Sequence, residues 1–393
     1  MPEKRRSAAV FGLSTEGYAV AGLLAASGIR TSLVDETLFV AMDLKPQDLP
    51  GRRPLSSLVG EDALRGFEPL DRALGRADLV IFTPRIRKLG EEALGDLTAK
   101  LREVCKHLSK GCTFVYGLPS RLGGNQENIS FLEKQTGFEA GKDISYVFAP
   151  LQPSRGVPTV IGAGPRGKGD VSSLGLKGWA EQPPLPMSVA EALHLRYVTI
   201  AKSGMVVELE FAKILGKGGE GDYPKDSPAR SVYVDELCEY LFDLKVASGS
   251  FKAGDPMLYL AAGMLKSIEG YPRLVVGRVR DLMRTEGLRA SRSTLHVIWS
   301  TDRYEMRGDK LAMRDSLTER LRELVGDLEV SGTEETAGGR TLATAFAEGR
   351  SNIFLTCSPK DHEAVSKLLS SRRIKEDAFV VKANLLAEHV SGA

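Results

Sequence analysis

The chain has 393 residues, of which 42% are hydrophobic and 26% are charged, as in a globular protein of two or three domains. Its 53 basic and 51 acidic residues nearly cancel, so bulk charge gives no support for nucleic-acid binding. A short apolar run near the start is broken by Ser14, Thr15 and Glu16, so neither a signal peptide nor a membrane span is predicted. We therefore expect a cytoplasmic protein with no membrane partner.

The spacing of the cysteines argues against two further kinds of site. They form neither a CxxC motif nor a cluster with histidine, which argues against a zinc site and against a disulfide framework. No metal site is predicted, and the thiols are expected to be reduced. The 4 cysteines are Cys105, Cys112, Cys238 and Cys357.

The N-terminal part of the chain alternates between strand and helix patterns. Helical patterns at 17–26 and 91–108 separate apolar runs, and this alternation predicts a parallel, doubly wound α/β sheet. The expected strands are residues 8–13, 31–35, 77–84, 112–119, 144–150 and 158–164.

The first turn of this sheet has a phosphate-binding pattern. Gly12-Leu13-Ser14-Thr15-Glu16-Gly17 fills a GxGxxG frame with Ser14 at the second glycine position. The first glycine permits a tight turn, the last lets helix and strand approach, and the N–H groups at the helix start can face a pyrophosphate. Asp35 ends the next strand, where an acid can bond a ribose hydroxyl, so NAD is favoured over NADP. The competing interpretation is a domain that no longer binds dinucleotide, because the Ser14 side chain can crowd the pyrophosphate.

The middle of the chain is predicted to be helical. A Gly- and Pro-rich linker spans 163–187, and a long helix follows over 188–215, with Ser188 and Glu191 as a capping box. Shorter helices are expected near 230–244, 256–268 and 272–286.

The last hundred residues return to an α/β pattern. Helices are expected at about 314–325, 341–348 and 359–370, between strand patterns. The expected strands are residues 294–300, 328–332, 352–357 and 378–383.

Several short matches, in the same order along the whole chain, resemble the UDP-glucose/GDP-mannose dehydrogenase family of nucleotide-sugar dehydrogenases. The order carries the resemblance, since each match alone is weak. The matches are the first βαβ unit at 8–35, VIFTP at 80–84, VPTVIGAG at 157–164, Ala190-Glu191 and Glu210 on the long helix, YPKD at 223–226, DPMLYLAA at 255–262, PRLVV at 272–276, and Met313-Arg314-Asp315-Ser316.

The resemblance implies three domains and a dimer. An NAD-binding Rossmann domain would span 1–185, a central helical dimerisation domain 186–287, and a C-terminal Rossmann-like domain that binds the nucleotide sugar 288–393. It implies NAD as cofactor, with contact at the Thr83-Pro84 turn, a nucleotide sugar as ligand, a homodimer, and a place in polysaccharide biosynthesis.

The departures from this family fall on its chemistry. Where the family has a nucleophilic cysteine, two residues before the proline of its loop, this chain has Asp222. A carboxylate is a poor nucleophile towards an aldehyde, whereas a thiolate is a good one. The family's lysine on the long helix corresponds to His194 and its asparagine to Val198, while Lys225 and Asp226 keep the family identities.

Each of these polar residues has a plain alternative role. His194 can be a structural histidine, Asp222 a solvated loop residue, and Lys225 with Asp226 a polar loop end. Arg314 can pair with a helix carboxylate or reach a nucleotide phosphate.

Two functions remain open on the sequence. One is an oxidoreductase that uses NAD and acts on, or binds, a UDP- or GDP-linked sugar. The other is a non-catalytic pseudoenzyme, either a sensor of NAD or nucleotide sugar or a dimeric scaffold. The loss of several cooperating catalytic groups favours the second, because losing one already removes most of the rate. The shorter hydroxyacid dehydrogenases related to 6-phosphogluconate dehydrogenase are a weaker match, because they lack a second α/β domain.

Overall fold

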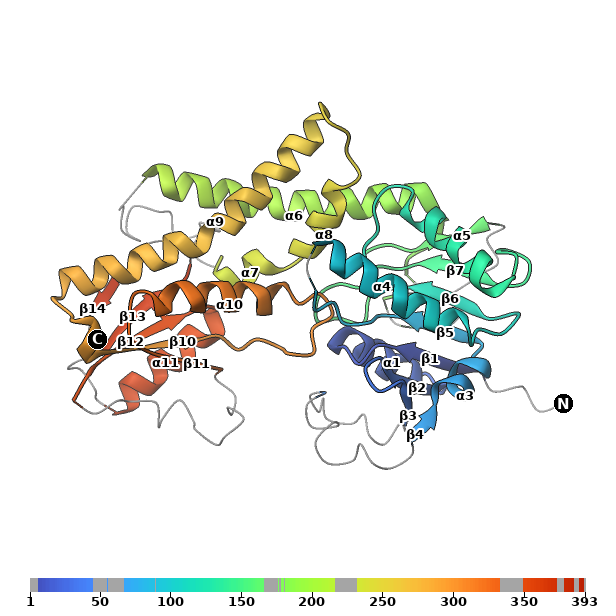
Figure 1. Cartoon of the computed structure of the whole chain (residues 1–393), viewed down its shortest axis with the longest axis horizontal. Helices are drawn as coiled ribbons and strands as arrows, with labels where there is room; N and C mark the ends of the chain where they lie inside the picture. Colours follow the sequence, from blue (N-terminus) through green and yellow to red (C-terminus); the bar gives the residue numbers. More distant parts are fainter. Residues whose placement is uncertain are drawn as a thin grey trace. The chain divides into compact units, whose positions relative to one another are not determined.

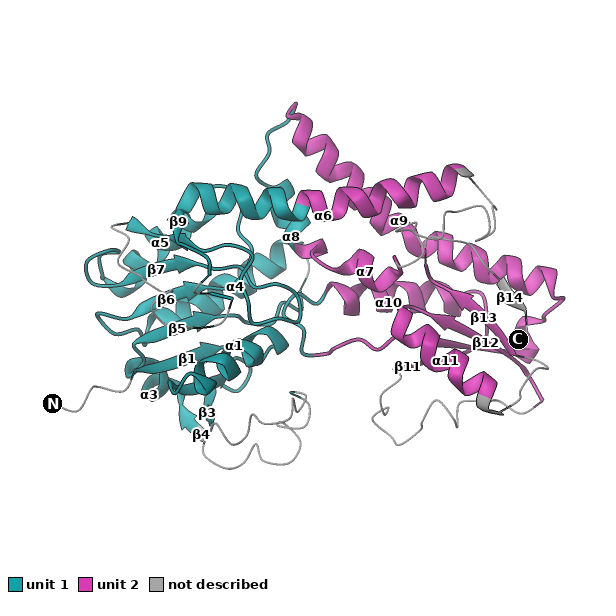
Figure 2. Cartoon of the chain, turned by 180° about the vertical axis from the view of Figure 1, so that it is seen from behind, with its two compact units in different colours: residues 1–198, 243–253, 304–308 teal, residues 199–242, 254–303, 309–393 magenta. Residues whose placement is uncertain are grey.

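The structure is a computed structural model of the whole chain. The residues that it describes are 6–44, 55, 67–88, 90–165, 176, 178–179, 181–215, 232–332, 349–372, 378–384 and 389–391. The chain forms two compact units, each assembled from separate stretches of sequence (Figure 2). Unit 1 comprises 1–198, 243–253 and 304–308, and unit 2 comprises 199–242, 254–303 and 309–393.

Unit 1 is built on one sheet (Figure 1). The strand order among the described residues is β4-β3-β2-β1-β5-β6-β7-β8-β9, with β1 parallel to both β2 and β5. The strands β5, β6 and β7 continue in parallel, and the hairpin of β3 and β4 extends the opposite edge. The strands are β1 (Ser7–Phe11), β2 (Arg30–Asp35), β3 (Val40–Leu44), β4 (Phe67–Pro69), β5 (Leu79–Phe82), β6 (Thr113–Tyr116), β7 (Ser145–Phe148), β8 (Gly162–Ala163) and β9 (Leu185–Pro186).

The central strands of this sheet are buried on both faces. All four residues of β5 are buried, as expected for a parallel sheet that helices cover on both sides. Phe11, Phe82 and Tyr116 stack across neighbouring strands, with ring centroids 5.5 and 5.8 Å apart. The helices of this part are α1 (Thr15–Ala26), α3 (Leu70–Gly75), α4 (Gly90–Cys105) and α5 (Gly124–Thr136).

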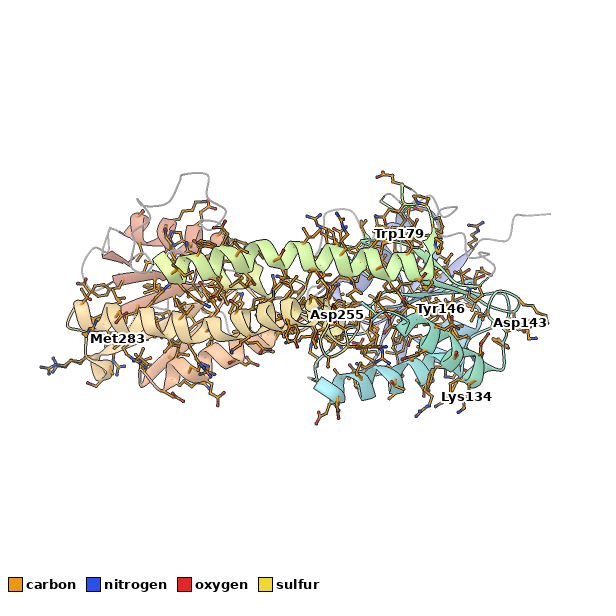
Figure 3. All side chains as sticks on the ribbon, turned by 90° about the horizontal axis from the view of Figure 1, so that it is seen from above. Lys134, Asp143, Tyr146, Trp179, Asp255 and Met283 are labelled. Carbon is orange, nitrogen blue, oxygen red and sulfur yellow. The ribbon has the colours of Figure 1, made fainter. Side chains whose placement is uncertain are left out.

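Two long helices follow in the chain. The helix α6 (Met187–Leu215) begins in unit 1 and ends in unit 2, and α9 (Pro256–Thr285) belongs to unit 2. The side chain of Asp255 accepts the Met257 N–H at 2.9 Å and so caps α9, whose other end lies just beyond Met283 (Figure 3). Between them lie α7 (Val234–Cys238) and α8 (Leu241–Ser248).

Unit 2 contains a second sheet, with strand order β11-β10-β12-β13-β14 among its described residues. The strands from β11 to β13 are parallel and β14 is antiparallel. Its core joins this sheet to α9 and α10 through residues such as Val275, Leu317 and Leu355. The elements are η6 (Ala290–Arg292), β10 (Ser293–Ile298), α10 (Asp309–Arg322), β11 (Asp327–Ser331), β12 (Ser351–Thr356), α11 (Pro359–Arg372), β13 (Ala378–Lys382) and β14 (His389–Ser391).

The predicted α/β fold class is confirmed, with corrections in detail. The two helices expected at 256–268 and 272–286 are one helix, α9, with Pro272 inside it. The expected capping box is wrong: α6 begins at Met187, so Ser188 lies within the helix, and Glu191 accepts N–H groups of another helix start instead. The helix expected at 341–348 and most of the linker at 163–187 lie outside the described residues. The three-domain division stays a prediction.

All four cysteines are buried and unpaired. Burial raises the pKa of Cys105 to about 12 and that of Cys112 to about 11, so both stay protonated at neutral pH. Within the described part of the chain, no helix is long and apolar enough to cross a bilayer, and no group of side chains suited to a metal ion occurs.

Candidate functional site

The candidate site of unit 1 lies where the strand order of its sheet reverses. From β1 the chain goes to β2 on one side, and from β5 it goes to β6 on the other. Doubly wound sheets bind their ligands at the carboxyl ends of the strands that flank such a reversal. The two loops here are the turn from Gly12 into α1 and the turn after β5 at Thr83.

The first turn keeps the conformation that its glycine predicts. Gly12 has φ +127°, and a Cβ built on it would lie 2.1 Å from the Thr83 carbonyl oxygen. Ser14 is the N-cap of α1: its Oγ accepts the Gly17 N–H at 3.0 Å and donates to the Thr83 carbonyl at 2.9 Å. The Ser14 side chain is therefore turned into the protein, and four of the predicted cofactor residues meet as one buried turn.

A distant segment of the chain covers this turn. The Thr15 N–H donates to the carbonyl oxygen of Tyr304 at 2.9 Å, and the Ile86 N–H donates to that of Met306 at 2.7 Å. The Glu16 carboxylate in turn accepts the Met306 N–H at 2.9 Å. Residues 304–308, which we call the covering segment, thus join the loops after β1 and β5 at the point of strand reversal.

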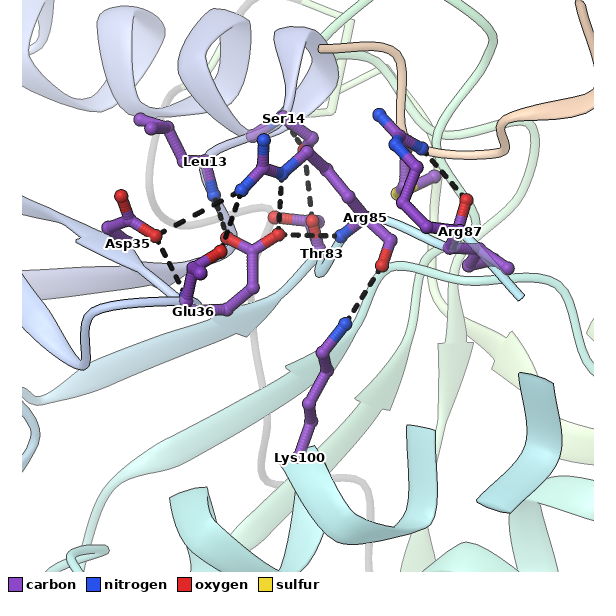
Figure 4. A network of polar contacts seen from close by, with 12 residues as sticks. Leu13, Ser14, Asp35, Glu36, Thr83, Arg85, Arg87 and Lys100 are labelled. Carbon is purple, nitrogen blue, oxygen red and sulfur yellow. Dashed lines mark hydrogen bonds and ion pairs between the residues drawn. The ribbon is translucent and has the colours of Figure 1, made fainter. Parts of the chain in front are cut away.

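A buried ion pair holds the other side of the turn (Figure 4). The Glu36 carboxylate accepts the Leu13 N–H at 2.6 Å and the Arg85 Nε–H at 2.7 Å. Burial alone would raise the pKa of Glu36, but Arg85 and the Leu13 N–H outweigh it and hold the pKa below its usual value. The neighbouring Asp35 accepts the Thr37 N–H at 2.7 Å and so caps the turn after β2.

These contacts bear directly on dinucleotide binding. A pyrophosphate at a Rossmann turn is held by N–H groups at the start of the helix. In this structure the N–H groups of Leu13, Thr15 and Gly17 already donate to Glu36, Tyr304 and Ser14. The arrangement does not fit an NAD pyrophosphate unless the covering segment moves away.

His194 lies in a second buried group in the same unit. Its Nδ1 is 2.8 Å from the Thr159 hydroxyl, and its Nε2 is 3.3 Å from an Asp243 carboxylate oxygen. Asp243 also pairs with Arg307, whose Nη2 lies 2.9 Å from the carboxylate and 2.6 Å from the Leu151 carbonyl oxygen. Arg307 belongs to the covering segment, so this group holds the segment against the rest of unit 1.

The electrostatics of the second group are those of a structural ion pair. Asp243 is fully buried; burial alone would raise its pKa, but Arg307 and His194 hold the pKa well below the usual range. His194 is only 2% exposed, which leaves no path for it to exchange a proton with a substrate in this conformation. The arrangement suits holding the chain together better than acid–base chemistry.

The remaining predicted residues are placed as follows. Asp222, Lys225 and Asp226 lie outside the described residues. Thr83 is fully buried, and Arg314 on α10 donates to the Thr301 hydroxyl at 2.8 Å.

Sequence reasoning missed the charged residues that close the turn. Glu36 stands beside the predicted Asp35, and Arg85 follows the predicted Thr83-Pro84 turn, so adjacency could have drawn attention to both. Asp243 and Arg307 carry no local signal, because they meet across a long stretch of chain.

Comparison with known proteins identifies the fold. No family model matches the sequence, and no curated protein matches it. Among solved structures, UDP-D-ManNAc dehydrogenase from Pyrococcus horikoshii superposes with TM-score 0.69 at 16% identity, over 97% of this chain and 96% of that one. UDP-glucose dehydrogenase from Pyrobaculum islandicum gives 0.57 at 15% identity, over 98% and 96%. NDP-N-acetyl-D-galactosaminuronic acid dehydrogenase from Methanosarcina mazei gives 0.55 at 12%, over 96% and 90%.

The chain has the fold of the nucleotide-sugar dehydrogenases. The likeness runs over nearly the whole length of both chains, which confirms the resemblance found in the order of the sequence motifs. The hydrogen bonds that occupy the first turn, and the buried contacts of His194, are observed in this chain and are not inferred from the similar structures.

Proposed function

We propose that this chain is a non-catalytic protein that keeps the nucleotide-sugar dehydrogenase fold and acts as a homodimeric scaffold. The observation that carries the proposal is the hydrogen bond from the Thr15 N–H to the Tyr304 carbonyl oxygen at the start of α1. A main-chain carbonyl thereby takes up an N–H donor that a dinucleotide phosphate would need.

The residues of the chemistry support the same conclusion. Asp222 stands where the resembling family has its nucleophilic cysteine, and Val198 stands where it has an asparagine. A valine side chain can donate no hydrogen bond to a developing oxyanion. His194, in the lysine position, is enclosed by Thr159 and Asp243.

The dimer proposal rests on the surface of α6. Among the exposed large apolar side chains of this helix, six, from 42% at Leu193 to 75% at Ile214, recur at alternating steps of four and three residues with Gly204 in the same row. This is the spacing of a helix that packs along a partner helix, and a glycine in the row permits close approach. A second copy of the chain presents the same row and is the partner that we propose. The six residues are Leu193, Tyr197, Ile200, Val207, Phe211 and Ile214.

The catalytic half of the proposal is tested by calorimetric titration with NAD, with a UDP-glucose dehydrogenase as the positive control. We expect no heat of binding at NAD concentrations that saturate the control, and no NADH production with UDP- or GDP-sugars. Saturable binding together with NADH formation would overturn the non-catalytic assignment.

The dimer is tested separately by light scattering after size-exclusion chromatography. We expect twice the mass of the chain, and a monomer for Phe211→Glu, because a charge in an apolar helix seam is strongly unfavourable. Glu208→Gln, on the same helix outside the row, is the matched control and should stay dimeric. A monomeric wild-type protein would refute this half alone.

A second candidate is an NAD-dependent oxidoreductase that acts on a nucleotide-linked sugar. The retained first turn, with Gly12 at φ +127°, favours it, and so does the position of Asp35 at the end of β2. It requires displacement of the covering segment by the cofactor. Protection of the 304–308 amides from hydrogen exchange should then fall when NAD is added, which the scaffold proposal does not predict.

A further inference from the structure

A small basic pocket lies on unit 2 between two packed helices. It has a volume of about 240 Å³ and lies between α9 and the end of α10. The buried residues Val275, Val279, Leu317 and Leu321 belong to one core cluster, so both walls of the pocket stand on a packed base. The lining residues are Arg273, Val276, Arg280, Arg320, Glu323 and Leu324.

The helix period brings these side chains together. Residues three, four and seven apart lie on one face of a helix, so Arg273, Val276 and Arg280 share a face of α9. Arg320 lies in the last turn of α10, and Glu323 and Leu324 follow directly after the end of that helix. Three arginine residues from two helices therefore line one small space.

Unlike Arg85 and Arg307 of unit 1, the arginines of this pocket have no carboxylate partner among the described residues. Arg85 and Arg307 each form an ion pair with a buried acid. Among the described residues, no hydrogen bond or ion pair is made by the side chains of Arg273, Arg280 and Arg320, and Glu323 is the one acid that lines the pocket. Like charges gathered in one pocket repel each other, and a bound anion removes that repulsion.

We propose that this pocket binds a diphosphate group. Guanidinium groups bind phosphate oxygens through paired N–H donors, and three of them can serve two phosphates. The volume is below the range of about 300–1,000 Å³ that encloses a drug-sized ligand, so the diphosphate itself fills the pocket and any attached group stays in solvent. The site uses unit 2 residues alone and does not depend on the α1 turn.

The experiment is calorimetric titration of the full chain with inorganic pyrophosphate in magnesium-free buffer, with UDP and orthophosphate in parallel. We expect saturable pyrophosphate binding that is tighter than orthophosphate binding and weakens as salt rises. Tighter binding of UDP would identify a nucleotide as the source of the diphosphate, and equal binding would identify free pyrophosphate.

Single substitutions assign the binding to the pocket. Arg280→Gln and Arg320→Gln should each weaken pyrophosphate binding roughly tenfold or more, because each removes a charge-assisted contact. Glu323→Gln should strengthen it. Arg289→Gln, an exposed residue of the same unit outside the pocket, should leave it unchanged. The proposal is overturned if pyrophosphate does not bind, or if the Arg280 and Arg289 variants weaken binding equally. Circular dichroism of each variant confirms that it is folded.

Discussion

In the two sheets, different parts of the chain cover the loops at the point where the strand order reverses. In unit 1, residues 304–308 meet Glu16 across 290 positions of sequence. In unit 2, the reversal between β10 and β12 is closed by its own loops, because Asp361 accepts the hydroxyls of Ser300 and Ser358, both at 2.7 Å. The contacts in unit 1 come from a distant stretch of the chain, whereas those in unit 2 come from the residues that directly follow the strands.

This difference predicts which set of contacts can be removed by substitution without changing the sheet beside it. The covering segment is held by a buried ion pair and by main-chain contacts from outside the strands, so a substitution there lowers the stability of unit 1 without altering its strand pairing. In unit 2, Asp361 is fully buried in the first turn of α11, so a change there also affects the start of that helix.

The largest decrease in the free energy of unfolding is expected from Arg307→Ala. It leaves the fully buried Asp243 without its main partner, and breaking a buried pair in this way costs about 3–5 kcal/mol. Urea unfolding followed by hydrogen exchange should show the loss in unit 1, with unit 2 amides unchanged. Arg314→Ala, which removes a half-buried arginine, is the control and should cost less than about 1 kcal/mol. Equal losses in both variants would contradict the fastening role.

A smaller decrease in the free energy of unfolding is expected from Gly12→Ala. The added methyl would meet the Thr83 carbonyl at 2.1 Å, and alanine disfavours a φ of +127°. Overpacking and strain of this kind cost about 1–3 kcal/mol. Thermal unfolding measures the loss, and Gly28→Ala is a matched control, because Gly28 also has positive φ but has open space around it. If both variants unfold at the same temperature, the close approach of Thr83 to Gly12 does not contribute to stability.

For unit 2 we expect a loss of about 1 kcal/mol from Ser358→Ala. The Ser358 hydroxyl accepts the Asp361 N–H at 3.1 Å and donates to its carboxylate, as an N-cap does. The loss should appear as faster hydrogen exchange in α11 and leave unit 1 unaffected. Ser370→Ala, near the other end of the same helix, should change little.

The smallest effect is a difference in pH response between the two closures. The folded pKa values of Glu36 and Asp243 are lowered, so their stabilisation is present above about pH 4 and is lost as the pH falls through the folded values. The groups that face them are Arg85, and Arg307 with His194. The pKa of Asp361 is raised by burial, so its contribution changes in the opposite direction.

Hydrogen exchange of each unit at pH 5, 4 and 3 measures this difference, after correction for the intrinsic exchange rate. Protection in unit 1 should fall first on acidification. Asp243→Asn should reduce that fall, and an unchanged profile in this variant would count against the role given to Asp243.

Most of the fold could be predicted from the sequence, because periodicity and apolar runs report local structure. The strands around Val10, Ile81 and Val297 were found in this way. The short edge strand β4 was missed, and Pro272 was taken as the start of a second helix. Tertiary packing decided the second case, since Tyr271, Pro272 and Val275 are all buried in the core that α9 shares.

The candidate site was predictable only in part. The glycine frame indicated the turn at Gly12, because backbone geometry restricts that position to few residue types. The sequence offered no means of finding that Tyr304 and Arg307 lie on this turn, since such contacts depend on how distant segments pack. The same holds for His194, whose environment is set by Asp243 from another part of the chain.

The four buried thiols give the molecule a property useful at the bench. A thiol that is shielded from solvent and protonated reacts slowly with alkylating reagents, so the native protein should take up little label. A single cysteine introduced on the surface, for example at Arg289, could therefore carry a fluorophore without removal of the native ones. Slow uptake of label by the native cysteines would in turn report transient opening of each core, with Cys105 and Cys112 reading one unit and Cys238 and Cys357 the other.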